Sequence, residues 1–252
     1  MEESDDGYSV AEQAGLLREL HRDPKILVLV NAWDVISART VAEVPGCDAV
    51  ATASAAITAA HGFDDGEQIP VDLMLSVVGR IAAAVDLPVT ADLEAGYGDV
   101  DGTVRRAVQL GVVGANIEDE MRPLDESVAM MRQAVRAGEA EGVPLVLNAR
   151  TDCYLRGGDT APEVLLAEAT ERGKAFLGVG AECVFVPGVV DRATIEALAE
   201  RFGPGRLSVY GQPGLPTPAE LAELGVARVS YGPFPQRRAL AALSDMASGL
   251  LT

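Results

Sequence analysis

The chain has 252 residues, with 38 acidic against 20 basic side chains and a formal net charge of −18 at pH 7. Binding to nucleic acid or to an anionic membrane is disfavoured by this charge, because the sequence carries no basic patch to offset it. A small molecule is therefore the expected partner, and the length fits one domain over 1–252.

The cysteines and the N-terminus indicate a cytoplasmic protein. Cys47, Cys153 and Cys183 are far apart and odd in number, so they predict neither a disulfide framework nor a zinc site. The first ten residues are acidic where a signal peptide would be basic and then apolar, and we expect 1–10 to be flexible. The longest apolar runs have the length of strands rather than of membrane spans.

After an expected short helix at 15–23, strand-like apolar runs alternate with helix-like segments. The expected strands are 26–33, 49–54, 87–94, 114–119, 144–151, 183–188, 206–211 and 227–232. Helical periodicity appears between most of them, at 76–85, 104–111, 124–135, 164–180 and 194–203, and Asp125 is a candidate N-cap. This alternation predicts parallel βαβ units, whose strands are covered on both faces.

Eight such units in a chain of this length favour a single α/β domain of the (β/α)8 TIM-barrel type over an open doubly wound sheet. The terminal segment 239–251 predicts a last helix. Its apolar residues would pack on the barrel or on a neighbouring subunit, and we expect a homo-oligomer, either a dimer or a tetramer.

Polar residues appear at the ends of four expected strands, in pairs two positions apart. Side chains alternate along a strand, so the members of a pair should face the same way. In a barrel these positions lie at the C-terminal mouth, where active sites form. The pairs are Thr52 with Ser54, Asp92 with Glu94, Glu118 with Glu120, and Arg150 with Asp152.

Several carboxylates around one mouth repel one another unless a cation neutralises them. Oxygen ligands without clustered histidine or cysteine favour Mg²⁺, or Mn²⁺, over zinc or copper. Arg150 has the planar fork that suits a carboxylate or phosphonate. Taken singly, however, an acid at a strand end is more often a helix cap or a solvated residue, Arg150 could simply pair with Asp152, and Trp33 fits core or pocket wall.

Taken together, these residues resemble the isocitrate lyase and phosphoenolpyruvate mutase superfamily. The fragments that carry the resemblance follow the order of that family over about 26–234. They are NAWDVISA, TASAAITAAHGFDDG, ADLEAGYG, ANIEDE, LNARTD, VFVPG and LAELGVARVSYGP.

The resemblance implies a barrel that binds Mg²⁺ and a 2-oxo acid at its mouth. Asp92 would be the direct metal ligand, with Glu94 and Glu118 acting through water and Asp65 supporting the ion. Ser54, Ala55 and Ala56 would hold the carboxylate and oxo group of the substrate near Trp33, and Arg150 would clamp its anionic end. The expected catalytic residues are Arg150, Glu118 and Ser54.

The chain also departs from that family. Between the fourth expected strand and the next helix it has only EDEMRPLDES, so the loop cysteine of the lyases and the asparagine loop of the mutases are both absent. The seventh strand reads RLSVYG where many members have Pro-Leu-Asn-Val. Cys153 is a candidate substitute acid, but a small buried structural cysteine is the preferred interpretation.

The expected function is Mg²⁺-dependent cleavage of a bond in a small 2-oxo or 2-hydroxy acid by a lyase or hydrolase. A phosphonomutase is the first alternative, disfavoured because a short loop excludes water poorly. The second alternative is a barrel that binds metal and ligand without catalysis.

Overall fold

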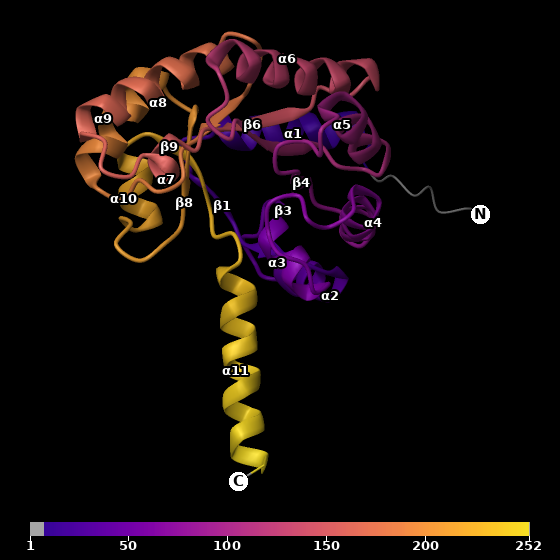
Figure 1. Ribbon diagram of the computed structural model, residues 1–252. Coiled ribbons are helices and arrows are strands. Elements are labelled where there is room, and N and C mark those ends of the chain that lie inside the picture. The colour runs from indigo at the N-terminus through magenta and orange to yellow at the C-terminus, as the bar shows by residue number, and fades with distance from the viewer. Residues whose placement is uncertain (1–7, 252) are drawn as a thin grey trace.

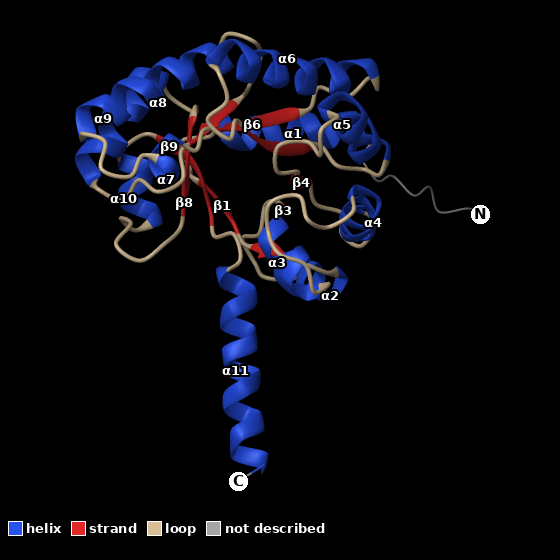
Figure 2. Cartoon of the chain, in the orientation of Figure 1, coloured by secondary structure: helices blue, strands red, loops and turns tan. Residues whose placement is uncertain are grey.

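The computed structural model describes residues 8–251 and contains one ring of parallel strands surrounded by helices (Figures 1 and 2). The strands are paired in the order β1-β9-β8-β7-β6-β5-β4-β3-β2. Their bounds are β1 Leu27–Leu29, β2 Asn31–Ala32, β3 Val50–Thr52, β4 Val89–Asp92, β5 Gly114–Glu118, β6 Val146–Arg150, β7 Cys183–Phe185, β8 Leu207–Tyr210 and β9 Val226–Ser230.

The first expected strand, 26–33, is divided into two short strands. β1 pairs with β9, whereas β2, one residue further on, pairs with β3. One continuous segment therefore joins the last strand to the next one in the ring and closes it into a barrel. The predicted eight-unit barrel is confirmed, with nine strands because the first is interrupted at Val30.

The expected helices are all present, and four short ones were not expected: α2, α3, α7 and α10. The helices are α1 Val10–Arg22, α2 Val35–Ala42, α3 Ser54–Ala60, α4 Val71–Ala82, α5 Val100–Gln109, α6 Leu124–Ala140, α7 Cys153–Arg156, α8 Pro162–Leu177, α9 Arg192–Phe202, α10 Pro218–Glu223 and α11 Phe234–Leu251. The unexpected helices have only four to eight residues, too few to show a clear apolar period.

Two local expectations need revision. Ser9 caps α1 through a capping box with Glu12, so helical order begins within the segment 1–10 that we expected to be flexible; residues 1–7 lie outside the described part of the chain. The assignment of Asp125 as an N-cap is wrong, because Pro123 occupies that position and Asp125 lies in the first turn of α6. There its charge still interacts favourably with the helix dipole.

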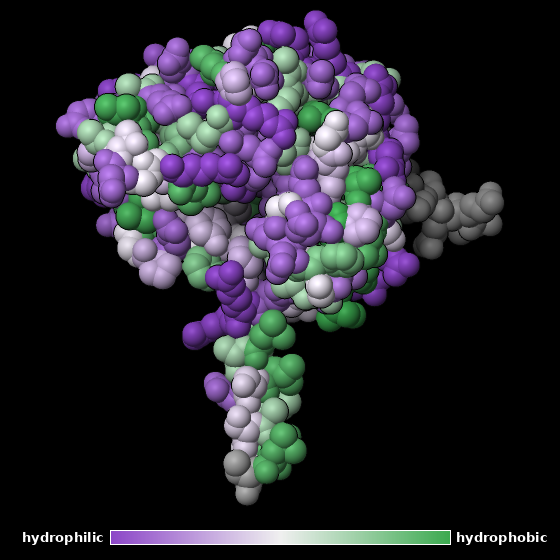
Figure 3. All heavy atoms as spheres, in the orientation of Figure 1, coloured by the Kyte–Doolittle hydropathy of each residue, from purple (hydrophilic) through white to green (hydrophobic). Residues whose placement is uncertain are grey.

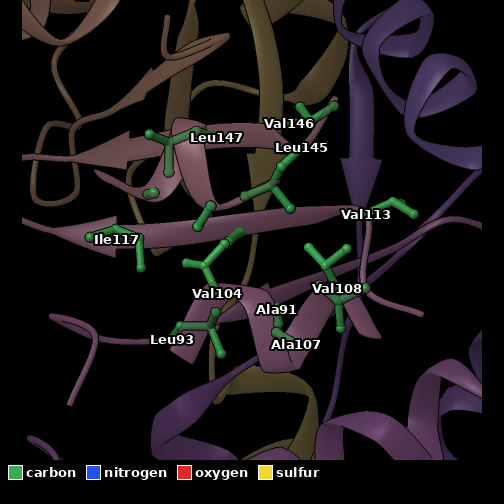
Figure 4. Close-up of a cluster of buried hydrophobic side chains, with 14 of the residues drawn as sticks. Ala91, Leu93, Val104, Ala107, Val108, Val113, Ile117, Leu145, Val146 and Leu147 are labelled. Carbon is green, nitrogen blue, oxygen red and sulfur yellow. The ribbon is translucent and has the colours of Figure 1, made fainter. Parts of the chain in front are cut away.

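The main hydrophobic core lies between the strands and the outer helices. Figure 4 shows part of it, where Val104 and Val108 of α5 pack beside Ile117 of β5 and Leu147 of β6. At the N-terminal end of the ring, α1 contributes the buried Leu17 to the same cluster. Apolar burial of this kind is the dominant stabilising term of the fold.

The interior of the barrel, in contrast, is polar at its centre. Asn148 Nδ2 of β6 donates to Asn116 Oδ1 of β5 at 2.8 Å, and Arg228 Nη2 of β9 donates to the same oxygen at 3.2 Å. Strands β5 and β9 are separated by three others in the ring, so the second contact crosses the barrel interior. Many barrels fill this space with branched apolar residues.

Helix α11 extends away from the barrel, and only Gln236 is buried along its described length (Figure 1). Its apolar side chains gather along one side (Figure 3), and Leu240, Leu243 and Met246 are more than half exposed. Val28 of β1 and Val30, which lies between β1 and β2, are also partly exposed, at 37% and 36%. Only the start of α11 contacts the chain's own barrel, through Phe234 and Gln236, and the expected terminal segment 239–251 does not pack on it.

Candidate active site at the barrel mouth

The predicted polar residues meet in two adjoining hollows at the C-terminal ends of the strands. The upper hollow is lined by polar residues that include Asn31, Asp92 and Asn116, and also by Leu155, Phe185, Pro187 and Tyr210. The lower hollow is more acidic. Both are lined by Ser54, Asp65, Arg150 and Leu155. The two hollows therefore form one continuous site at the mouth.

Asp92 ends β4 and is fixed by the start of α3. One of its oxygens, Oδ2, accepts from the backbone N of Ser54 at 3.1 Å and from Ser54 Oγ at 2.9 Å. The Ser54 hydroxyl also lies 3.5 Å from Asp65 Oδ1, in the loop that follows α3. Asp92 Oδ1 has no hydrogen-bond partner among the described residues, so it is the oxygen available to a ligand.

Glu94 reaches the site from a loop rather than from a strand. It has a positive φ of 51°, which turns the chain immediately after β4. Its carboxylate accepts from Tyr97 Oη at 2.7 Å and from the backbone N of Glu67. Glu94 thereby ties its own loop to the Asp65 loop and still lines the lower hollow.

Arg150, at the end of β6, forms ion pairs with two carboxylates. Its Nη1 lies 2.7 Å from Glu118 Oε2, and its Nε lies 2.7 Å from Asp152 Oδ1. The ion pair with Asp152 is the structural alternative considered from the sequence, and it is present. Arg150 also lines both hollows, so its position is compatible with a second role toward a ligand.

The electrostatics of the mouth reflect this concentration of acids. Burial, together with Asp152, Asp92 and Glu94, raises the pKa of Glu118 to about 8 against the opposing effect of Arg150. Burial and Asp92 raise the pKa of Asp65, and burial is also the main cause of the raised pKa of Glu94. Carboxyl groups with raised pKa values are typical of functional sites.

Oxygen donors of this kind suit Mg²⁺ or Mn²⁺. Within residues 8–251, no group of three or more acidic, histidine or cysteine side chains is arranged to hold a metal ion directly. The donor set thus fits a cation bound directly by one carboxylate, with the others acting through water. Asp92 is the best candidate for the direct contact because Oδ1 is free.

Not every residue expected at the site lines it. Ser54, Ala55, Asp65, Asp92, Glu94, Glu118 and Arg150 line one or both hollows. Trp33 and Ala56 do not; Trp33 packs against the core, and the Ala56 carbonyl accepts from Gln236 of α11.

The prediction that Glu120 faces the mouth, which assumed that side chains alternate along a continuing strand, is wrong. The strand ends at Glu118, and Glu120 has a φ of 47° and forms an ion pair with Arg122 instead of lining the mouth. Thr52, also paired on that argument, is buried and accepts from the backbone N of Asp92.

Several lining residues were missed from the sequence. Asn31 Oδ1 accepts from the backbone N of Tyr231 and of Gly232, at 2.7 and 2.8 Å, and so ties the two ends of the barrel together. Asn116 lines the upper hollow from β5. The available signal was an asparagine inside an apolar run, which requires hydrogen-bond partners once buried. The other missed lining residues are Ala53, Gly66, Leu155, Arg156, Phe185, Pro187, Tyr210, Ser230, Gly232, Pro233 and Arg237.

The loop that departs from the family pattern supplies no obvious acid or base. Asp119 is fully buried, accepts from the backbone N of Asp152 and pairs with Arg172 at 3.2 Å. Cys153 is buried, and burial raises the pKa of its thiol to about 12. These features favour the structural interpretation of Cys153.

This closed parallel barrel is similar to the solved structure of 2,3-dimethylmalate lyase, a member of the phosphoenolpyruvate mutase and isocitrate lyase superfamily, with 25% identity and a TM-score of 0.83 over 94% of this chain and 84% of that one. The chain belongs to the phosphoenolpyruvate phosphomutase family, whose model matches residues 17–251. It is 31% identical to the uncharacterized protein Rv1998c of Mycobacterium tuberculosis H37Rv, covering 91% of this chain and 86% of that protein. It is 28% identical to an oxaloacetate decarboxylase of Pseudomonas aeruginosa PAO1, with coverages of 88% and 79%.

Solved structures show the same relationship. A crystal structure named a "putative phosphonomutase" from Burkholderia cenocepacia J2315 is 39% identical, with a TM-score of 0.90 and coverages of 96% of this chain and 99% of that one. An oxaloacetate acetylhydrolase in complex with its product oxalate is 25% identical, with a TM-score of 0.85 and coverages of 96% and 87%. The named relatives of this chain thus include a decarboxylase, a 2-methylisocitrate lyase of Bacillus subtilis, an acetylhydrolase and a phosphonomutase, the last named as "putative".

No helix within residues 8–251 combines the length and apolar character needed to cross a membrane.

Proposed function

We propose that this protein is a Mg²⁺-dependent lyase or hydrolase that cleaves a C–C bond of a small 2-oxo or 2-hydroxy acid. The observation that carries the proposal is that five carboxylates line a single mouth together with Arg150, which lines both hollows. The carboxylates are Asp65, Asp92, Glu94, Glu118 and Asp152. The acids supply the cation site, and the arginine supplies a complement to the substrate carboxylate.

Each residue has a role that follows from its contacts. Asp92 would bind the cation through Oδ1, because Ser54 already holds Oδ2. The cation, when bound, stabilises negative charge that develops on the substrate oxygen. Arg150 would orient the substrate carboxylate with the N–H groups that its two ion pairs leave free.

Glu118 is the best candidate for proton transfer. Burial and the neighbouring acids raise the pKa of Glu118 to about 8 although Arg150 Nη1 lies 2.7 Å from it, so this group can gain and release a proton near neutral pH. This role would compensate for the missing loop cysteine. No other acidic group in the loop 119–123 is oriented to replace it, since Asp119 and Glu120 are engaged in ion pairs.

Turnover assays with and without Mg²⁺ test the proposal. Oxaloacetate and methylisocitrate probe C–C cleavage, and phosphonopyruvate probes the phosphonomutase alternative. Mg²⁺-dependent turnover of either C–C substrate supports the proposal. Turnover of phosphonopyruvate alone would favour the mutase, and stabilisation by Mg²⁺ and oxalate without any turnover would indicate the non-catalytic barrel.

A further inference from the structure

Arg228 is an unusual residue to find inside the barrel. It is 1% exposed and is the bulkiest of the fully buried side chains in the described chain. No carboxylate forms an ion pair with it within residues 8–251, and its Nε and Nη1 have no hydrogen-bond partner there. Burying a cation in this way is costly, and an apolar side chain would fill the same space without that cost.

The one hydrogen bond that the Arg228 side chain makes within the described chain determines the orientation of a residue at the mouth. Its Nη2 donates to Asn116 Oδ1 at 3.2 Å, and Asn148 Nδ2 donates to the same oxygen at 2.8 Å. A guanidinium has only donors, so the atom of Asn116 that faces Arg228 must be the oxygen. The Asn116 carboxamide therefore cannot rotate by half a turn without placing its NH₂ group against the Arg228 donors.

Because Asn116 Oδ1 faces Arg228 and Asn148, the NH₂ group of Asn116 is directed away from these two residues. Asn116 lines the upper hollow, beside Asp92, with which it pairs in register across β4 and β5. Its Nδ2 has no hydrogen-bond partner among the described residues. A donor held in place beside the acids would suit an oxygen of an anionic ligand.

We propose that Arg228 is a positioning residue: from inside the barrel it fixes the Asn116 carboxamide so that Nδ2 donates to a ligand oxygen at the mouth. The inference rests on the proposed function, because the ligand is the small oxygen-rich anion proposed for this site. In this proposal Arg228 affects which ligand binds although it does not line either hollow, because it acts from the barrel interior through Asn116.

The first test replaces Asn116. Asn116→Asp keeps an oxygen for Arg228 and Asn148 but presents an acceptor in place of the donor. We expect the melting temperature to be retained and the affinity for oxalate, titrated calorimetrically with saturating Mg²⁺, to fall by roughly ten- to a hundredfold. Thr90→Val is the matched control, since Thr90 is buried in the neighbouring strand and its Oγ1 has no hydrogen-bond partner among the described residues. It should leave oxalate affinity unchanged.

The second test asks whether Arg228 acts through Asn116. Arg228→Met should weaken oxalate binding severalfold at a temperature well below unfolding, and Arg228→Lys, which keeps a donor and the charge, should restore much of it. In an Asn116→Ala background, Arg228→Met should have no further effect on affinity. A purely structural Arg228 would change the melting temperature and leave all these affinities alone.

The outcomes separate the two proposals. If the wild type binds no oxalate with Mg²⁺, the proposed function fails and the ligand role of Asn116 fails with it. If the wild type binds oxalate and Asn116→Asp binds it equally well, the inference alone is overturned. That decision does not depend on whether Arg228→Met folds.

Discussion

Replacing Arg150 by lysine tests the role of the arginine at the mouth. The arginine holds Glu118 and Asp152, both at 2.7 Å, through different nitrogen atoms. Lysine keeps the charge but has a single ammonium group in place of the planar fork, so it cannot hold both carboxylates and also contact a ligand. The variant should therefore lose stability and ligand affinity together.

The magnitudes follow from the contacts. Asp152 is 2% exposed and would keep only its longer ion pair with Arg156, at 3.4 Å, so loss of the 2.7 Å contact with Arg150 should cost about 1.5 to 3 kcal/mol in the free energy of unfolding. For a chain of this length that corresponds to a fall in melting temperature of roughly 3 to 12 °C. Loss of a charged hydrogen bond to the ligand should lower oxalate affinity by roughly ten- to a hundredfold.

The assay measures melting temperature by circular dichroism and oxalate affinity by calorimetry with Mg²⁺. Arg172→Lys is a suitable control, because Arg172 is also buried and pairs with Asp119 at 3.2 Å but does not line the mouth. It should lose stability and keep its oxalate affinity. If Arg150→Lys behaves like this control, Arg150 is a structural ion-pair partner and the clamp assignment is wrong.

Three further predictions concern the metal, the pH dependence and the assembly. Asp92→Ala should fold and lose the Mg²⁺-dependent rise in melting temperature; an unchanged Mg²⁺ affinity by calorimetry would contradict the ligand assignment. Between pH 4.5 and about 8, native Glu118 keeps a proton that the unfolded chain has released, so the melting temperature without metal should fall as pH rises. Glu118→Gln should reduce that slope, and an identical slope would refute the assignment. Light scattering should show a particle larger than 26.3 kDa that Leu243→Asp dissociates, because α11 exposes an apolar side; a monomeric wild type would refute the predicted oligomer.

The sequence predicted the barrel well because parallel strands covered on both faces appear as apolar runs, and that signal is strong at β5 and β6. It predicted the central acids for a related reason, since Asp92, Glu118 and Arg150 end strands that point toward one mouth. Both predictions depend on where apolar runs begin and end along the chain, and this pattern is visible in a single sequence.

Other features depend on contacts between distant segments and could not be read in this way. Glu120 was misplaced because a positive φ ends the alternation after Glu118. Tyr210 and Arg237 line the mouth only because β8 and the start of α11 approach the other strands in three dimensions. Asn116 and Arg228 are 112 positions apart, and nothing local in either segment indicates that they meet.

The polar interior of the barrel has a consequence for how this protein could change over time. The apolar clusters that dominate burial lie mainly outside the ring, between strands and helices, whereas Asn116, Asn148, Ser208 and Arg228 meet inside it. Substitutions in the outer layer leave cavities and threaten folding. Substitutions inside the ring alter mainly which donors and charges lie beneath the mouth. Ligand preference can thus diverge by exchange of a few interior polar residues, while the layer that holds the barrel together stays the same.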